Sequence, residues 1–223
     1  MIWILAGFVF GGLVPYMARR FAKFMPATPA YALYRLIKPN KHTNRENEKY
    51  KQLKKKYMLR SLLYALVSAG VSAGVVYKFG VLSQVWWLGF VWAMLLLAET
   101  DFKMFLLPDI LTVPLLICGF FFAASAFNPA VGAFESALAA LLGYMVPVAA
   151  TILMLWKSTE AFGGGDIKLL SAIGAWLGIE GLLYTILMSC VIFAVCMLIR
   201  RKKTGAFGPA LVAAAMVYLL FLI

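Results

Sequence analysis

Residues 162–170 read F-G-G-G-D-I-K-L-L, three consecutive glycines followed by an acidic residue and an apolar run. Glycine has no Cβ atom, so such a run can adopt backbone angles closed to other residues and allows another segment to approach closely. A second acidic stretch, E-T-D-F-K-M-F-L-L-P-D at residues 99–109, also lies where an apolar segment meets a polar one. A lone acid such as Asp166 commonly caps a helix, but two acidic stretches in equivalent places indicate a shared site.

The composition is that of a membrane protein. Hydrophobic residues make up 64% of the 223 residues and charged residues only 13%, and the mean hydropathy is +0.89. Soluble globular domains contain about twice this share of charged residues. The apolar content continues to the last residue, so a cleaved signal peptide does not account for it. We therefore predict an all-α, polytopic integral membrane protein.

Eight apolar stretches divide the chain. They cover residues 2–18, 61–77, 82–98, 110–127, 136–156, 167–180, 183–199 and 206–222. A helix needs about 20 residues to cross about 30 Å of hydrocarbon, and the stretch at 167–180 is shorter than that. It is predicted to be a half-helix or a helix enclosed by others. The expected fold has about eight transmembrane helices.

The basic residues predict the orientation of the chain. Thirteen Lys or Arg lie within residues 19–60 beside only two glutamates, and they supply most of the net charge of +12. Basic segments next to membrane spans stay in the cytoplasm, so residues 19–60 are predicted to form a basic cytoplasmic loop, with the N-terminus outside. The same alternation of sides places Asp101, Asp109 and Asp166 together on the cytoplasmic side.

The predicted organisation thus has three parts: a first transmembrane helix over residues 1–18, the basic loop over 19–60 and a membrane-embedded core over 61–223. A charge of this size in a soluble chain would suggest nucleic acid. Here it is explained by topology and by attraction to anionic lipid. The expected partner is the lipid bilayer, and no nucleic-acid partner is predicted.

Cysteine and histidine offer little chemistry in this chain. Cys118, Cys190 and Cys196 all lie in apolar runs, and the single histidine is His42. No zinc-type spacing is present, so no metal site is predicted. A nucleophile activated by histidine would have to use His42, which lies in the charged loop without a suitable acid nearby.

The acidic residues are the stronger candidates, because acids at the edge of membrane spans are energetically unfavourable. Peptide hydrolysis needs an activated water molecule and an acid for the leaving amine. Two carboxylates that share one proton can supply both, and such a pair titrates as a unit. Asp101 and Asp166 are suitably placed. Glu99 and Asp109 stay open as members of the pair or as charges at helix ends.

Two other functions compete with hydrolysis. A multi-span transporter or ion carrier could use membrane-edge acids as a relay, but such a relay predicts acids near the middle of the bilayer. Here the acids lie at span ends beside Lys103 and Lys168, two lysines that the topology rule explains. An assembly component with a degenerate site is the third reading, and the full set of acidic motifs argues against it.

Three motifs together resemble the type IV prepilin peptidases, which belong to the Gly-x-Gly-Asp class of membrane aspartic proteases. The first is Asp101 followed eight residues later by Asp109, which comes directly after Leu107-Pro108. The second is the segment from Gly163 to Leu170, which leads into a small-residue helix. The third is Phe207-Gly208-Pro209. The resemblance covers the membrane core from about residue 85 onward.

The resemblance implies that Asp101 and Asp166 are the catalytic pair and that the core over 61–223 is an aspartic protease. It also implies a supporting motif of Gly163, Gly164, Gly165, Pro108, Asp109 and Lys168. The implied substrates are prepilins or pseudopilins of type IV pili or type II secretion, cut after a short basic leader. Cleavage is implied at the cytoplasmic face of the bacterial inner membrane, without a cofactor for proteolysis.

The N-terminal part departs from the family pattern. Many members carry two C-x-x-C pairs after the first span and N-methylate the new N-terminus with S-adenosylmethionine. The loop over residues 19–60 has no cysteine, and only residues 11–16 and Arg20 faintly echo the corresponding family stretch. Methyltransferase activity, with S-adenosylmethionine as its cofactor, therefore stays open at this point. The sequence also leaves the oligomeric state open.

Overall fold

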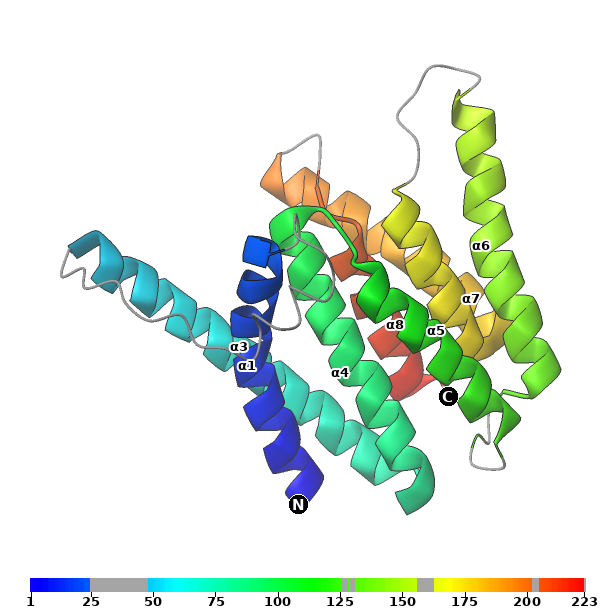
Figure 1. Ribbon diagram of the computed structural model, residues 1–223, viewed down its shortest axis with the longest axis horizontal. Coiled ribbons are helices and arrows are strands. Elements are labelled where there is room, and N and C mark those ends of the chain that lie inside the picture. The colour runs from blue at the N-terminus through cyan, green and yellow to red at the C-terminus, as the bar shows by residue number, and fades with distance from the viewer. Residues whose placement is uncertain (25–47, 126–127, 129–130, 156–162, 202–204, 223) are drawn as a thin grey trace.

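The computed structural model describes residues 1–24, 48–125, 128, 131–155, 163–201 and 205–222, and over this part of the chain it contains helices and no strand (Figure 1). The helices are α1 (Ile2–Phe24), α3 (Glu48–Lys78), α4 (Val81–Met104), α5 (Asp109–Ala124), α6 (Ala133–Leu155), α7 (Gly164–Arg200) and α8 (Gly208–Phe221). Five of them, α1, α3, α4, α6 and α7, contain stretches long and apolar enough to cross a membrane. The prediction of a polytopic helical membrane protein is confirmed.

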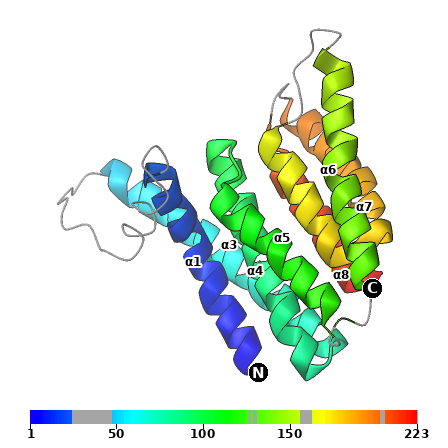
Figure 2. The same ribbon diagram turned by 45° about the vertical axis from the view of Figure 1, so that its right-hand side comes forward.

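The described residues form seven helices, not the eight separate ones predicted. The stretches predicted at 167–180 and 183–199 both lie in α7, because no polar loop separates them. The helix breaks at Gly178, where φ is 72° and ψ is −171°. Figures 1 and 2 show its two arms running back past each other, the first in yellow and the second in orange. The backbone N–H of Ile179, which begins the second arm, donates to Glu135 Oε1 at 3.3 Å.

The break depends on glycine, because only glycine readily adopts the backbone angles found at position 178. An added Cβ atom would also come within 3.2 Å of the carboxyl carbon of Glu135. We expect Gly178→Ala to lower the free energy of unfolding by about 2–3 kcal/mol, the range for a strained backbone plus a local collision. Thermal unfolding in detergent measures the effect. Gly70→Ala is the control, since a Cβ there meets open space, and an equal loss in both variants would contradict the explanation.

The ends of the predicted basic loop are helical. α1 continues past residue 18 to Phe24, and α3 already begins at Glu48. The segment at 48–56 is rich in Lys, Glu, Gln and Leu, which are strong helix formers, so the polar sequence extends the helix instead of ending it. Residues 25–47, which include His42, lie outside the described residues.

α1 packs closely against α3. A Cβ atom at Gly11 would collide with the backbone of α3 at Tyr64 and Ala65, so the absence of a side chain lets the two helices touch. The hydroxyl group of Ser61 donates to the carbonyl oxygen of Gly12 at 2.6 Å. α1 and α3 therefore form one unit, which lies beside α4 in Figure 1.

An aromatic cluster joins α4, α5 and α7. The rings of Phe90 and Trp176 stack with centroids 4.9 Å apart, and Trp87 meets Phe122 edge-on at 5.1 Å. The indole N–H of Trp176 donates to the carbonyl oxygen of Leu115 at 2.8 Å. Such aromatic pairs contribute beyond their buried area, so this cluster fixes the helices that carry the two acidic stretches.

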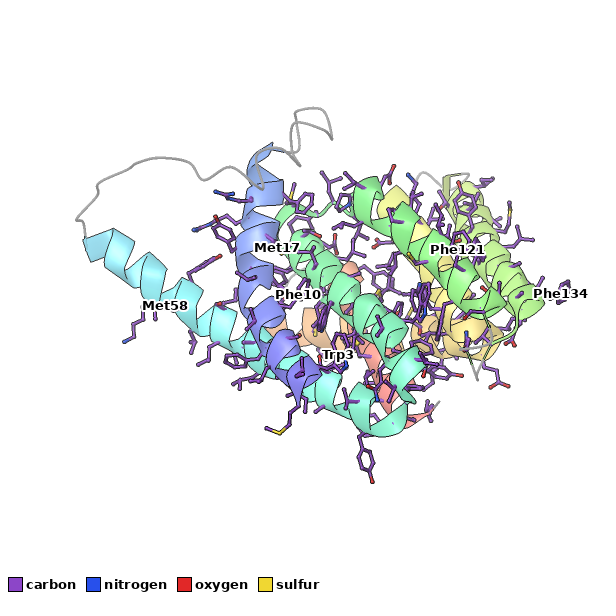
Figure 3. The ribbon with its side chains drawn as sticks, turned by 60° about the horizontal axis from the view of Figure 1, so that its bottom comes forward. Trp3, Phe10, Met17, Met58, Phe121 and Phe134 are labelled. Atoms are coloured by element: carbon purple, nitrogen blue, oxygen red, sulfur yellow. The ribbon has the colours of Figure 1, made fainter. Side chains whose placement is uncertain are left out.

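Large apolar side chains also cover the outside of the protein. Met58, Phe121 and Phe134 project away from the helices in Figure 3, and their exposed fractions are 61%, 66% and 82%. A soluble protein rarely exposes so much contiguous apolar surface. Lipid is the natural environment for these faces, which agrees with the membrane spans.

Candidate active site

Asp101 lies in the last turn of α4 and is only 5% exposed. Its Oδ2 atom accepts a hydrogen bond of 2.8 Å from the backbone N–H of Gly208. Gly208 is the first residue of α8, and the first N–H groups of a helix have no partner within the helix. The start of α8 thus satisfies the buried carboxylate. A Cβ at position 208 would lie 2.6 Å from the same oxygen, so this close approach requires glycine.

Asp166 lies in the first turn of α7. Its Oδ1 atom is buried and accepts no hydrogen bond from any described residue. The negative charge of Asp101 acts on the Asp166 carboxyl group, so the two acidic motifs face each other across the ends of α4 and α7. No side chain caps the start of α7, and the helix-cap explanation of Asp166 therefore finds no support here.

The three glycines before Asp166 have different surroundings. Gly163 is the N-cap residue of α7 in an extended conformation. A Cβ at Gly165 would lie 2.8 Å from Cβ of Leu107, in the connection between α4 and α5, whereas a Cβ at Gly164 would meet open space. The close approach predicted from the glycine run is therefore made at Gly165. Phe162 lies outside the described residues.

Asp109 and Lys168 form an ion pair between the starts of α5 and α7. Lys168 Nζ donates to both carboxylate oxygens of Asp109 at 2.7 Å. The Asp109 side chain is 62% exposed, and an exposed pair of this kind contributes about 1 kcal/mol or less to stability. Pro108 precedes it as the N-cap residue of α5. Asp109 thus has a partner of its own, apart from Asp101 and Asp166.

Glu99 is fully buried in a separate ion cluster. Arg60 Nη2 lies 2.7 Å from Glu99 Oε2, and Lys103 Nζ lies 2.8 Å from Oε1. Lys103 also donates to the carbonyl oxygen of Pro15 at 3.0 Å. Residues two apart on a helix point in directions about 200° apart, so Glu99 and Asp101 serve different faces of α4. The Glu99 cluster joins α1, α3 and α4.

Two contributions to this region were missed by sequence reasoning. Arg60 was counted only among the loop charges, although its place at the edge of the apolar stretch sets it apart from the other basic residues. Gly208 is part of the third motif, and the sequence alone assigns it no role. Its signal was the glycine before a proline at a helix start, a position where a backbone N–H is free.

The described residues offer little for a bound metal or cofactor. Within the described ranges, no three His, Cys, Asp or Glu side chains gather where a metal could bind. S-adenosylmethionine carries ribose hydroxyl groups and an ammonium group, which need acidic or other polar partners. The cavity of about 630 Å³ between α1 and α3 is lined mainly by apolar side chains such as Phe8 and Leu62, and no acid lines it. Its polar lining, Lys55, Tyr57 and Ser61, supplies no carboxylate for the ammonium group.

Comparison with known proteins identifies the family. Residues 88–198 match the family model described as the Type IV leader peptidase family. The Prepilin leader peptidase/N-methyltransferase of Aeromonas hydrophila is 33% identical over 182 residues, which cover 74% of this chain and 58% of that relative. The protein of the same name from Pectobacterium carotovorum subsp. carotovorum is 38% identical over 128 residues, covering 52% of this chain and 44% of the relative.

The matches are partial in length. The chain spans 58% of the Aeromonas hydrophila relative, and no solved structure matches it. The matched range nevertheless includes both acidic stretches, with Asp101, Asp109 and Asp166, and three rings of the aromatic cluster, Phe90, Phe122 and Trp176. The predicted resemblance is confirmed: through residues 88–198, the chain belongs to the Type IV leader peptidase family.

Proposed function

We propose that this chain is a membrane aspartic endopeptidase that removes the short basic leader of type IV prepilins or pseudopilins. The observation that carries the proposal is the convergence of Asp101 and Asp166 at the ends of α4 and α7, with the charge of one acting on the other. The family match and the names of the relatives support it. No observation on the described residues favours a transporter, since these acids lie at helix ends.

In the proposed reaction the two carboxyl groups act as a unit on a water molecule. The ionised carboxylate takes a proton from the water as its oxygen attacks the carbonyl carbon of the scissile peptide bond. The protonated carboxyl group supports the carbonyl oxygen, and a proton then passes to the leaving nitrogen as the C–N bond breaks. The products are a free acid and a free amine. The N–H of Gly208 orients Asp101, whereas one oxygen of Asp166 accepts no hydrogen bond from the part of the chain that the structure describes.

The supporting residues then hold this arrangement together. Gly165 lets the start of α7 approach the connection between α4 and α5. Lys168 and Asp109 tie the starts of α7 and α5 by their ion pair. We assign these residues to positioning, and the chemistry to Asp101 and Asp166.

The proposed topology has eight crossings, with each arm of α7 counted as one. It places the N-terminus outside and the basic segment over residues 19–60 in the cytoplasm, followed by the protease core over 61–223. Asp101 and Asp166 then act at the cytoplasmic face of the bacterial inner membrane. The distribution of Lys and Arg supports this orientation.

Gly208→Ala tests the link between the third motif and the carboxylates. The added methyl group would lie 2.6 Å from Asp101 Oδ2, so the carboxylate must move. We expect kcat to fall about ten- to a hundredfold, the usual effect of a small misplacement of a catalytic group. Gly80→Ala is the control, since its Cβ would only touch Ser83 Oγ at 3.9 Å. Unchanged cleavage by Gly208→Ala would remove the positioning role.

The function itself is tested by incubating the purified full chain, in liposomes, with a prepilin of a type IV pilus. A variant with both Asp101→Asn and Asp166→Asn serves as the negative control for contaminating proteases. Mass spectrometry of the product identifies the cleaved bond, which we expect directly after the basic leader. If the wild type leaves several prepilins and pseudopilins intact, the proposal fails, and flux assays would then test the transporter.

The same mass measurement tests a second activity, N-methylation of the new N-terminus. The names of the relatives support it, whereas the cavity between α1 and α3 offers no carboxylate to the cofactor. A product that gains the mass of one methyl group only when S-adenosylmethionine is added would establish methylation by this chain. An unmethylated product in the presence of the cofactor would limit the chain to proteolysis.

A further inference from the structure

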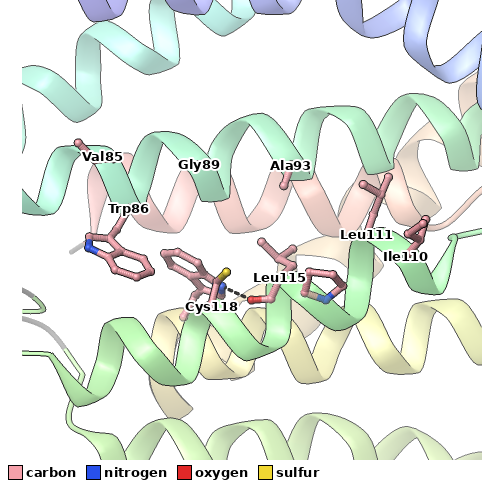
Figure 4. A pocket seen from close by; sticks show the side chains of 10 residues that line it. Val85, Trp86, Gly89, Ala93, Ile110, Leu111, Leu115 and Cys118 are labelled. Atoms are coloured by element: carbon pink, nitrogen blue, oxygen red, sulfur yellow. Dashed lines mark hydrogen bonds between the residues drawn. The ribbon is translucent and has the colours of Figure 1, made fainter. Parts of the chain in front are cut away.

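An apolar groove of about 380 Å³ lies between α4 and α5 (Figure 4). α4 contributes Gly89 and Ala93 to its lining, α5 contributes Pro114 and Cys118, and α7 contributes Trp176. The indole N–H of Trp176 already donates to a backbone carbonyl of α5, shown by the dashed line in Figure 4. The lining therefore presents apolar surface, and its natural occupant is an apolar segment.

The α4 wall of the groove is open to a second helix. Gly89 and Ala93 lie one helical turn apart, and both line the groove. A Cβ built on Gly89 meets nothing within 4 Å. In membranes, small residues spaced by four positions allow another helix to approach the backbone closely. The backbone of α4 is thus accessible from the groove over at least one turn.

The groove leads to the candidate active site. Ile110 and Leu111, which line one end of the groove, directly follow Asp109 in α5. Asp109 is paired with Lys168, which lies two residues after Asp166. Along α4, Gly89 and Asp101 are separated by about 18 Å at the rise of an α-helix. An apolar helix lying along α4 would therefore pass through the groove and bring its end to the level of the carboxylates.

We propose that the groove between α4 and α5 binds the apolar helix that follows the cleavage point in a prepilin-like substrate. This inference rests on the proposed peptidase function and adds the place where the substrate is held. The substrate helix enters the groove from the membrane, since the neighbouring side chains of α5 at Val113, Ile117 and Phe121 are exposed and apolar. The leader then extends past the connection between α4 and α5 toward Asp101 and Asp166.

A rival surface lies on the other side of α4. A smaller cavity of about 240 Å³ lies between Phe102, the second arm of α7 and α8, and it is lined in part by Cys196 and the charged Arg200. The guanidinium group of Arg200 lies over the ring of Phe102, 5.4 Å from its centroid. A cationic group at the mouth suits an apolar helix less well than the groove between α4 and α5 does.

The native cysteines distinguish the two surfaces. Cys118 lines the proposed groove, Cys196 lines the rival cavity, and Cys190 is exposed and lines neither. In the Asp166→Asn variant, which keeps the substrate uncut, we expect disulfide cross-links between Cys118 and single cysteines placed along the substrate helix. They should recur at about every third or fourth position and disappear in Cys118→Ser. Cross-links through Cys196 or Cys190 instead, or none at any position, would overturn the proposal, the last result being expected if lipid fills the groove.

A second measurement uses enzyme that keeps its carboxylates. Gly89→Leu fills the groove, and we expect it to raise KM for a membrane-embedded prepilin about tenfold, equivalent to losing about 1.4 kcal/mol of binding. Gly70→Leu is the matched control, because a side chain there also meets open space but lies on α3, away from the groove. An unchanged KM in Gly89→Leu would overturn the proposal. Failure of the peptidase function is a separate outcome, in which the wild type itself cleaves no prepilin.

Discussion

Asp166→Asn is expected to reduce prepilin cleavage by at least about a thousandfold, the upper part of the range for loss of a general acid or base. Asparagine keeps the shape of the side chain but can neither take nor supply a proton. Asp166 Oδ1 is buried without a hydrogen-bond donor from the described residues, so the substitution breaks no hydrogen bond to that atom. Loss of cleavage therefore reports the loss of proton transfer by Asp166. Asp101→Asn should have the same effect, and the double variant should be no worse than either single one, because the pair acts as a unit.

The assay is cleavage of a prepilin by purified protein in liposomes, followed by gel shift and mass spectrometry. Glu180→Gln is the matched control, since it removes an exposed carboxylate from the second arm of α7. Asp109→Asn should lower cleavage far less than either catalytic variant, because Asp109 only positions the start of α7 through its ion pair with Lys168. If either Asp101→Asn or Asp166→Asn cleaves at a rate near that of the wild type, the assignment of the catalytic pair is wrong.

Glu99→Ala is expected to give the largest loss of stability in the chain, about 3–5 kcal/mol. Glu99 is fully buried and paired with both Arg60 and Lys103. Removing it leaves two cationic groups partly buried without their counter-charge, and it separates α4 from the unit formed by α1 and α3. Unfolding of the purified protein by added denaturing detergent measures the change.

The matched control is Asp109→Ala, which breaks an exposed ion pair and should cost about 1 kcal/mol or less. A triple variant, with Glu99→Leu, Arg60→Leu and Lys103→Leu, should recover most of the lost stability, because it leaves no buried charge unpaired. If Glu99→Ala is no less stable than Asp109→Ala, the cluster does not hold the helices together. If Glu99→Ala behaves as expected but the triple variant does not recover stability, the packing of the longer native side chains accounts for the difference.

The membrane class and most helices could be predicted from the sequence, because hydrophobic length and the distribution of charge are local properties. The number of separate helices could not be predicted from the sequence. The break at Gly178 looks like any other glycine in an apolar run, and it is stabilised by Glu135, 43 residues earlier in the chain. The helical ends of the basic segment were also missed, since helix propensity continued where hydrophobicity stopped.

The candidate site likewise has a part that local sequence predicts and a part that depends on distant contacts. The position of the acids at the edge of apolar stretches indicates a site but leaves Glu99 and Asp109 open, and the choice of Asp101 and Asp166 rests on the family resemblance. Their surroundings depend on long-range contacts that no local pattern records. The donor to Asp101 is Gly208, 107 residues away, and one of the two partners of Glu99 is Arg60, 39 residues away. Only the folded arrangement separates the ion cluster of Glu99 from the pair formed by the two aspartates.

The bend of α7 also sets the depth at which Asp166 lies in the bilayer. Its first arm, residues 164–177, has 14 residues before the break at Gly178, which corresponds to about 21 Å of helix. A typical hydrocarbon layer is about 30 Å thick, so the arm that carries Asp166 is shorter than the bilayer by roughly a third. Residues 169–178 are buried among the other helices, so the short arm is tolerated without direct contact with lipid. Its end lies below the surface of a thick bilayer but nearer to bulk water in a thin one, and cleavage should therefore be faster in bilayers of short-chain lipids than in thick ones.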